Sequence, residues 1–190
     1  LCAAPLAGAA PPGYACGRCR ARPPVYDRLL ALWSYEPPLD AVVRALKFGR
    51  LDYLGRHLGL ALAEALGGEL GGADLVVPVP LHWRRRLRRG YNQAERIARP
   101  LARALDRPLA AALRRLRATP PQSGLGRSER LKNPRRAFGA RRGIQLAGRT
   151  VLLVDDVATT GATLDAAAAA LKGAGAAAVV ALVAGRTPDA

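Results

Sequence analysis

The sequence predicts an α/β domain in which a twisted parallel sheet carries helices on both faces. Three runs dominated by aliphatic residues, at 75–79, 151–154 and 179–184, have the composition of buried parallel strands. The run at 151–154 leads through a polar turn into an alanine-rich segment, the order of a strand followed by a helix. No apolar run approaches the roughly 18 residues of a membrane helix. No signal peptide is visible, so a cytoplasmic protein is expected.

The remaining elements follow from local patterns. In chain order we expect a strand at 29–35, helices at 38–48 and 51–66, a strand at 75–79, an arginine-rich loop at 84–89, a helix that begins at Asn92, a polar functional loop or lid at 119–133, the strand at 151–154, a helix from Gly161 to about Gly173 and a strand at 179–184. Leu39, Val42, Val43 and Leu46 recur at helical spacing. Asn92, with Glu95 three residues later, resembles a capping box.

The positive charge is concentrated in one part of the chain. The 190 residues carry a formal net charge of +16, and residues 82–142 account for all of it. Such a contiguous basic segment favours a polyanionic partner. Arg96, Arg99, Arg103 and Arg107 would extend it along one helix face. The alternative is coding bias that places arginine at ordinary surface positions.

All three cysteines lie in the first 24 residues, which are rich in Pro, Gly and Ala and predict a small appendage. Cys16 and Cys19 have the spacing at which two thiolates reach one tetrahedral zinc ion, and Cys2 supplies a third. The sequence contains no methionine, so we expect the chain to begin at Leu1 through processing or because it is a fragment. We expect Cys2 to be the second member of an earlier Cys-x-x-Cys pair, whose first member, the fourth ligand, lay upstream of Leu1. Zinc is expected in the intact protein rather than in the chain as given. A redox pair or plain reduced thiols are the alternatives.

The most informative segment is 151–163. Asp155 and Asp156 follow the apolar strand, at the edge where open α/β sheets bind ligands. Two carboxylates there suit ribose hydroxyls, or a magnesium ion carried by a diphosphate. The turn after them, with Gly161 and a new helix N-terminus, suits a phosphate. The alternative is a strand-to-helix turn in which Asp155 and Thr163 only cap a helix.

Segment 151–163 resembles the phosphoribosyl-pyrophosphate (PRPP) signature of the type I phosphoribosyltransferases. Four further stretches resemble the ComF family of phosphoribosyltransferase-like proteins: the Cys16 and Cys19 pair, 77–82 with the arginines after it, 89–94, and 122–125 with Arg130 and Asn133. The resemblance implies a type I phosphoribosyltransferase core at 25–190, preceded at 1–24 by a truncated zinc-ribbon-like element. Members typically bear two Cys-x-x-Cys pairs, whereas this chain shows one and a half.

The layout and the resemblance together assign roles to individual residues. Asp155 and Asp156 are the expected catalytic pair, which binds ribose and Mg²⁺. The 5′-phosphate is expected at Ala158, Thr159, Thr160, Gly161, Ala162 and Thr163, diphosphate or another polyanion at His82, Arg84, Arg85, Arg86 and Lys47, the closing lid at Gln122 and Arg130, and zinc at Cys2, Cys16 and Cys19. Lys47 and Arg50 are alternatively solvated cations at a helix end.

Two functions stay open at this point. In the first, the chain binds PRPP or a related ribose phosphate with magnesium and acts in competence-type DNA uptake. Its arginine-rich part would then contact single-stranded DNA or a DNA-uptake ATPase, with Trp83 and Tyr91 stacking on bases. In the second, it is an active phosphoribosyltransferase of nucleotide salvage or metabolism, in which a nitrogen nucleophile displaces diphosphate. No residue indicates which acceptor would be recognised.

Overall fold

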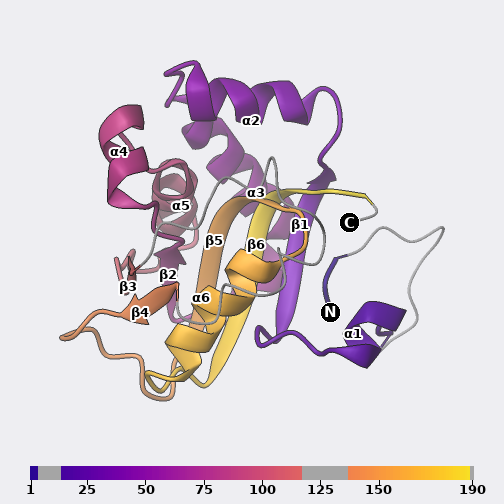
Figure 1. Cartoon of the computed structure of the whole chain (residues 1–190), viewed down its shortest axis with the longest axis vertical. Coiled ribbons are helices and arrows are strands. Elements are labelled where there is room, and N and C mark those ends of the chain that lie inside the picture. Colours follow the sequence, from indigo (N-terminus) through magenta and orange to yellow (C-terminus); the bar gives the residue numbers. More distant parts are fainter. Residues whose placement is uncertain (4–13, 117–136, 189–190) are drawn as a thin grey trace.

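A four-stranded parallel sheet organises the chain, as a computed structural model that describes residues 1–3, 14–116 and 137–188 shows (Figure 1). The strand order is β1 (Arg28–Ser34), β6 (Ala178–Arg186), β5 (Thr150–Ala158) and β2 (Leu75–Pro78). β3 (Leu113–Arg115) and β4 (Phe138–Ala140) form a separate antiparallel pair. The long central strands, β5 and β6, pair in parallel along their whole length.

Helices cover both faces of this sheet, because successive side chains of a buried strand point to opposite sides. The helices are α1 (Gly17–Ala21), α2 (Leu39–Phe48), α3 (Leu54–Leu70), α4 (Trp83–Arg89), α5 (Gln93–Ala104) and α6 (Ala162–Lys172). Leu152 and Val154 of β5 pack in one apolar cluster with α2, α3 and α5. Val151 and Leu153 pack in a second cluster with α6 and the β3–β4 pair. Figure 1 shows α6 in front of the sheet with α3 behind it. The predicted α/β architecture is confirmed.

Several predicted boundaries are wrong in instructive ways. The arginine-rich segment 84–89 is a helix, α4, and not a loop. Helix α3 continues through Gly67 and Gly68 to Leu70, four residues beyond the predicted end. Strand β5 continues to Ala158 instead of ending at Val154, because its partner β6 continues to Arg186. The predicted lid at 119–133, with Gln122 and Arg130, lies outside the described residues.

The N-terminal residues lie beside β1 (Figure 1). The backbone amide of Leu29 donates to the carbonyl of Leu1 at 2.9 Å, which fixes the first residues of the chain along the edge strand. Among the described residues, no helix has the length and apolar character needed to cross a membrane.

Candidate functional site

Asp155 and Asp156 lie at the point where β5 loses one of its two neighbours. β2 pairs with β5 only as far as Val154, while β6 continues beside β5 past both acids. The next residue after β2, Val79, still donates its amide to the carbonyl of Val154 at 2.8 Å. The two carboxylates are therefore buried at the carboxyl edge of the sheet, the place where open α/β sheets bind ligands.

Asp156 pairs with a lysine from the end of α2. Lys47 Nζ lies 2.6 Å from Asp156 Oδ2, and 24 % of the Lys47 side chain and 5 % of the Asp156 side chain are exposed. Although burial opposes it, the charge of Asp156 raises the pKa of Lys47, which keeps the ammonium protonated. Within the described part of the chain, no donor is aligned for a hydrogen bond to Asp156 Oδ2. The contact is therefore an ion pair in which Asp156 Oδ2 is buried against the Lys47 ammonium.

Asp155 has a different environment, since the adjacent residue of a strand faces the other side of the sheet. Burial, together with the charge of Asp156, raises the pKa of Asp155 to about 8. Its Oδ1 accepts a hydrogen bond from the amide of Asp156 at 2.9 Å. Arg115 of β3 is near enough for its charge to interact with that of Asp155. The pair thus contains one carboxyl that tends to hold a proton and one that is ion-paired.

The loop after β5 turns sharply at Gly161 into α6. Gly161 has φ of +77°, a conformation that residues with a side chain rarely adopt. A Cβ at this position would also lie 3.0 Å from the hydroxyl of the buried Tyr26. Thr160 Oγ1 accepts a hydrogen bond from the amide of Ala162 at 3.3 Å, which closes the turn. The turn therefore leads directly into the N-terminus of α6, where backbone amides without helix partners favour an anion.

A pocket of about 200 Å³ lies over this loop. Its lining brings together all six residues predicted for the 5′-phosphate with two from elsewhere in the chain: Tyr35, Lys47, Val157, Ala158, Thr159, Thr160, Gly161, Ala162, Thr163 and Leu164. Lys47 places one positive charge at the edge of the loop, close to Asp156. The pocket offers hydroxyls, backbone amides and an ammonium group, which are donors suited to a phosphate ester.

A second pocket, of about 410 Å³, adjoins the first through the same lysine. It is lined by Lys47, Phe48, Arg50, Arg85, Arg88, Arg89 and Tyr91. Arg85, Arg88 and Arg89 share one face of α4, because residues three and four apart meet on a helix. The guanidinium of Arg89 lies 5.2 Å from the centre of the Phe48 ring. We call these residues the basic pocket.

The structure places His82, Arg84 and Arg86 outside the lining of both pockets. His82 Nδ1 accepts from the amide of Arg84 at 3.4 Å and so caps α4. Burial and the neighbouring arginines lower the pKa of His82, which favours this neutral, accepting form. Arg84 lies over the ring of the exposed Trp83, at 5.2 Å.

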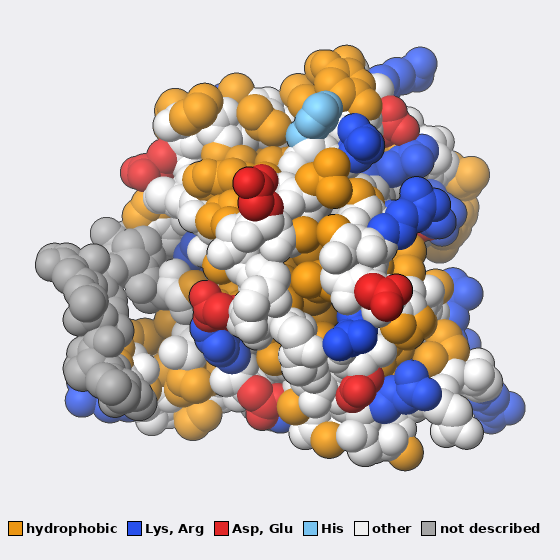
Figure 2. All heavy atoms as spheres, turned by 180° about the vertical axis from the view of Figure 1, so that it is seen from behind, with side chains coloured by type: hydrophobic (Ala, Val, Ile, Leu, Met, Phe, Trp, Pro, Cys, Tyr) orange, Lys and Arg blue, Asp and Glu red, His pale blue; other side chains and the backbone are white. Residues whose placement is uncertain are grey.

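Tyr91 and the predicted arginine stripe are partly committed to contacts within the chain. The hydroxyl of Tyr91 donates to the carbonyl of Leu46. Arg96 pairs with Asp52 at 2.9 Å and Arg99 with Glu95 at 2.7 Å, so two members of the stripe are offset by acids. Figure 2 shows the face opposite to the view of Figure 1, where acidic side chains are interspersed and basic ones gather towards the side on which α4 lies. The stripe is therefore a weaker candidate for a polyanion than the basic pocket.

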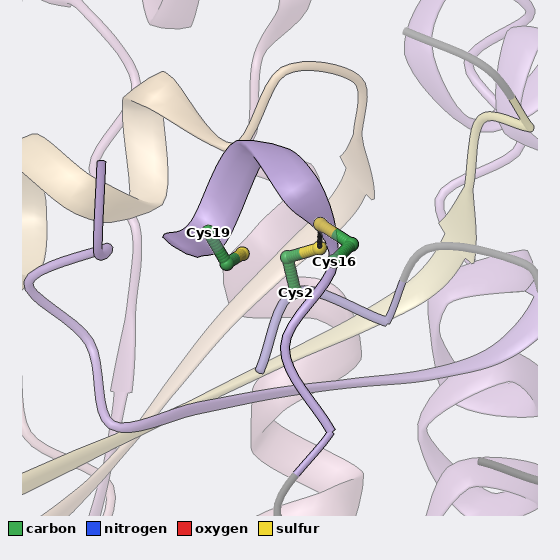
Figure 3. A group of neighbouring side chains, drawn as sticks. All are labelled: Cys2, Cys16 and Cys19. Carbon is green, nitrogen blue, oxygen red and sulfur yellow. Dashed lines mark hydrogen bonds between the residues drawn. The ribbon is translucent and has the colours of Figure 1, made fainter. Parts of the chain in front are cut away.

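The three cysteines form a compact group (Figure 3). Their sulfur atoms all lie within 4.8 Å of one another, and Cys2 Sγ is 3.6 Å from Cys16 Sγ. Zinc–sulfur bonds of about 2.3 Å in a tetrahedral site separate the sulfurs by about 3.8 Å, so this spacing fits a zinc ion. A backbone hydrogen bond from Cys19 lowers the pKa of Cys16 to about 7, whereas burial raises that of Cys19 to about 12.

Comparison with known proteins identifies the family. Residues 89–188 match the family model described as "Phosphoribosyl transferase domain". The chain is 39 % identical over 170 residues to the DNA utilization protein YhgH of Escherichia coli (strain K12), an alignment that covers 86 % of this chain and 74 % of that protein. It is 35 % identical to Competence protein F of Haemophilus influenzae, over 79 % of this chain and 69 % of the relative. This chain belongs to the ComF family.

Among solved structures, glutamine PRPP amidotransferase from B. subtilis, complexed with ADP and GMP, superposes with a TM-score of 0.47 and 26 % identity. The superposition covers 68 % of this chain and 25 % of that one. The type I phosphoribosyltransferase fold of this ComF-family chain follows from the family match and from its parallel sheet with helices on both faces.

Sequence reasoning missed part of what the structure brings together here. It did not pair Lys47 with Asp156, and it left Phe48, Arg88 and Arg89 out of the anion-binding set. The spacing of Arg85, Arg88 and Arg89 contained the signal, since these three share a face only if the segment is helical. Gly90, just after the run, is a second signal of a helix, because glycine is common at helix C-termini. In the structure Gly90 ends α4 with φ of +86°.

Proposed function

We propose that this chain binds PRPP or a related ribose phosphate together with Mg²⁺, and that it serves competence-type DNA uptake by handling single-stranded DNA. The observation that carries the first part is the position of Lys47, which lines both pockets and pairs with the buried Asp156. PRPP has a phosphate at one end of its ribose and a diphosphate at the other. Two adjoining anion pockets with acids beside them match that arrangement.

Each part of the site has a task in this proposal. The loop from Thr159 to Thr163 binds the 5′-phosphate, the acid pair accepts from the ribose hydroxyls, and the basic pocket receives the diphosphate. Asp155 and Asp156 would also supply oxygen ligands to Mg²⁺, directly or through water. Bound Mg²⁺ would offset the charge of the diphosphate. Lys47 pairs with Asp156 until the ligand arrives.

Calorimetric titration of PRPP, with and without magnesium, tests the ligand assignment. We expect magnesium-dependent binding in the wild-type chain and at least tenfold weaker binding in Asp155→Asn and Asp156→Asn, because each removes a carboxyl group that would bind the ribose or Mg²⁺. Asp52→Asn, which removes an exposed acid paired with Arg96, is the matched control and should bind like the wild type. Equal affinity in all four proteins would refute the assignment.

The DNA-handling part of the proposal depends on the basic pocket and on the relatives' names. YhgH is named for DNA utilization and the H. influenzae relative for competence. Arginines on one face of α4, beside the exposed ring of Phe48, provide phosphate contacts and a stacking surface, and the exposed ring of Trp83 offers a second stacking surface elsewhere on the same helix. A DNA-uptake ATPase is the second partner that we propose. An acidic segment of that ATPase would bind to the same basic face.

The cysteine group completes the proposal as a zinc site. Cys2, Cys16 and Cys19 fit three positions of a tetrahedral ion, which leaves one for a further ligand. A zinc titration monitored with a chromogenic chelator should give one ion per chain, and Cys19→Ser should weaken it strongly. Zinc binding that is unchanged in Cys19→Ser would contradict the site.

A cytoplasmic location also belongs to the proposal, since three metal-binding thiols need a reducing compartment.

An active transferase is the second candidate, and the neighbouring diphosphate pocket favours it. In that reaction the bond between the anomeric carbon and the diphosphate breaks as a nitrogen nucleophile forms its own bond, and the basic pocket would hold the leaving diphosphate. Release of diphosphate from PRPP in the presence of candidate acceptors distinguishes this activity from binding alone.

A further inference from the structure

A buried arginine connects the cysteine group to the loop from Thr159 to Thr163, which we call the phosphate loop after its proposed ligand. Arg186, at the end of β6, is 3 % exposed. Its Nε donates to the carbonyl of Cys2 at 3.1 Å, and its Nη1 donates to the carbonyl of Ala158 at 3.0 Å. Ala158 is the last residue of β5 and directly precedes the loop. One rigid guanidinium therefore spans from a cysteine to the start of the loop.

The charge of Arg186 has no carboxylate to offset it within the described ranges. Arginine stays protonated in proteins, and a buried cation is costly unless an anion lies nearby. Among the groups that interact electrostatically with Arg186, Cys2 and Tyr26 are the ones that can become negative. Three thiolates on one divalent ion carry a net charge of −1, so a loaded cysteine group would supply the missing anion.

A second contact joins the same two regions. Tyr26, which follows the cysteine segment by a few residues, is buried directly beneath Gly161. The adjacent residue, Val25, donates its amide to Asp165 in the first turn of α6. Two contacts therefore connect the loop with the N-terminal region that carries the cysteines. Arg186 joins Cys2 to Ala158, and Tyr26 contacts the loop at Gly161.

We propose that Arg186 is a positioning residue that holds the phosphate loop in its binding geometry, and that it does so fully only when the cysteine group (Figure 3) carries a metal ion. What the loop binds rests on the proposed function. The coupling itself does not, because it concerns the order of the loop alone. A lysine cannot replace Arg186 in this role, since one ammonium on a flexible chain does not reproduce the planar fork.

Hydrogen exchange of the loop amides, with Zn²⁺ and with a chelator, tests this coupling without any PRPP. In the wild-type chain, Zn²⁺ should slow exchange across 159–163 by about tenfold. Groups that support metal ligands change metal affinity or activity by at least this factor. In Arg186→Lys the loop should exchange fast whether or not Zn²⁺ is present. Arg99→Lys, an exposed arginine in an ion pair, is the matched control and should respond like the wild type.

A second variant keeps the test decisive if Arg186→Lys is generally destabilised, which faster exchange in α5 would reveal. Cys19→Ser retains Arg186 and its two carbonyl partners, and its loop should exchange at the zinc-free rate under both conditions. Zinc protection of equal size in Arg186→Lys, or none in the wild type, would overturn the coupling. Zinc-dependent loop order in a chain that fails to bind PRPP would refute the proposed function and leave this inference standing.

Discussion

Lys47 Nζ and Asp156 Oδ2 lie 2.6 Å apart, and Lys47 lines two adjoining pockets. The lysine comes from the end of α2 and the aspartate from the carboxyl end of β5, so residues 109 positions apart make one electrostatic unit. The Lys47 ammonium offsets the charge of a carboxylate whose Oδ2 is itself buried. In the sugar-phosphate site that we propose, this pair would allow an acid to remain beside an anionic ligand.

Loss of this ion pair should affect both stability and binding. Lys47→Met leaves Asp156 buried without its partner, and we expect the free energy of unfolding to fall by about 1–3 kcal/mol, less than for a fully buried pair. PRPP affinity should fall at least tenfold. Lys172→Met breaks an equally close but more exposed pair with Asp27 and should cost under about 1 kcal/mol. Urea unfolding measures both variants, and equal losses would show that burial of Asp156 does not matter.

The raised pKa of Asp155 predicts how stability depends on pH. The folded chain keeps the proton up to about pH 8, whereas the unfolded chain loses it near the ordinary value of 3.8. Between these values the folded state binds more protons, so stability should fall as pH rises from about 4 to about 8. Asp155→Asn should reduce this slope and be more stable than the wild type at pH 8.

Melting temperatures measured between pH 5 and pH 9 test the prediction for Asp155. Asp52→Asn serves as the control and should retain the wild-type slope. A slope that persists unchanged in Asp155→Asn would show that another group carries the proton.

Gly161 is constrained by its backbone and by Tyr26, and the two effects can be separated. Gly143 has a similar φ of +82° with no atom within 4 Å of the position that a Cβ would occupy, so Gly143→Ala measures the backbone cost alone, about 1–2 kcal/mol. Gly161→Ala should cost about 1 kcal/mol more because of the contact with the Tyr26 hydroxyl. In a Tyr26→Phe background this excess should disappear. Denaturant unfolding of these two glycine variants, Tyr26→Phe, the double variant and the wild type measures the costs, and identical costs at both glycines would exclude the contact.

The α4 face predicts which arginines contact DNA. Replacing Arg85, Arg88 and Arg89 by Ala should lower affinity for single-stranded DNA and reduce the slope of log K against log salt by about 2, at roughly 0.7 per phosphate contact. Arg84→Ala with Arg86→Ala removes charge from the same helix outside the basic pocket and should change the slope much less. Fluorescence anisotropy over a salt series provides the measurement. Equal changes in both variants would mean that the arginines act only as diffuse charge.

The sequence predicted what depends on local pattern. Aliphatic runs located the strands, and the acids, threonines and Gly161 located the turn from β5 into α6, because each signal lies within a few residues. The Lys47–Asp156 pair and the contact of Arg186 with Ala158 depend on how α2 and β6 pack against β5, which no local spacing reveals. The helical state of α4 was missed because a run of arginines interrupted only by Leu87 suggested a loop. Its cap at His82 and its end at Gly90 show otherwise.

The most direct test of the central claim compares PRPP with its two fragments, ribose 5-phosphate and diphosphate, by calorimetry in magnesium. If the two pockets form one site that shares Lys47, PRPP will bind more tightly than either fragment and will displace both. Each fragment will then bind in the presence of the other, and Lys47→Met will weaken all three. PRPP that binds no better than ribose 5-phosphate, or that leaves diphosphate bound, would contradict the single shared site.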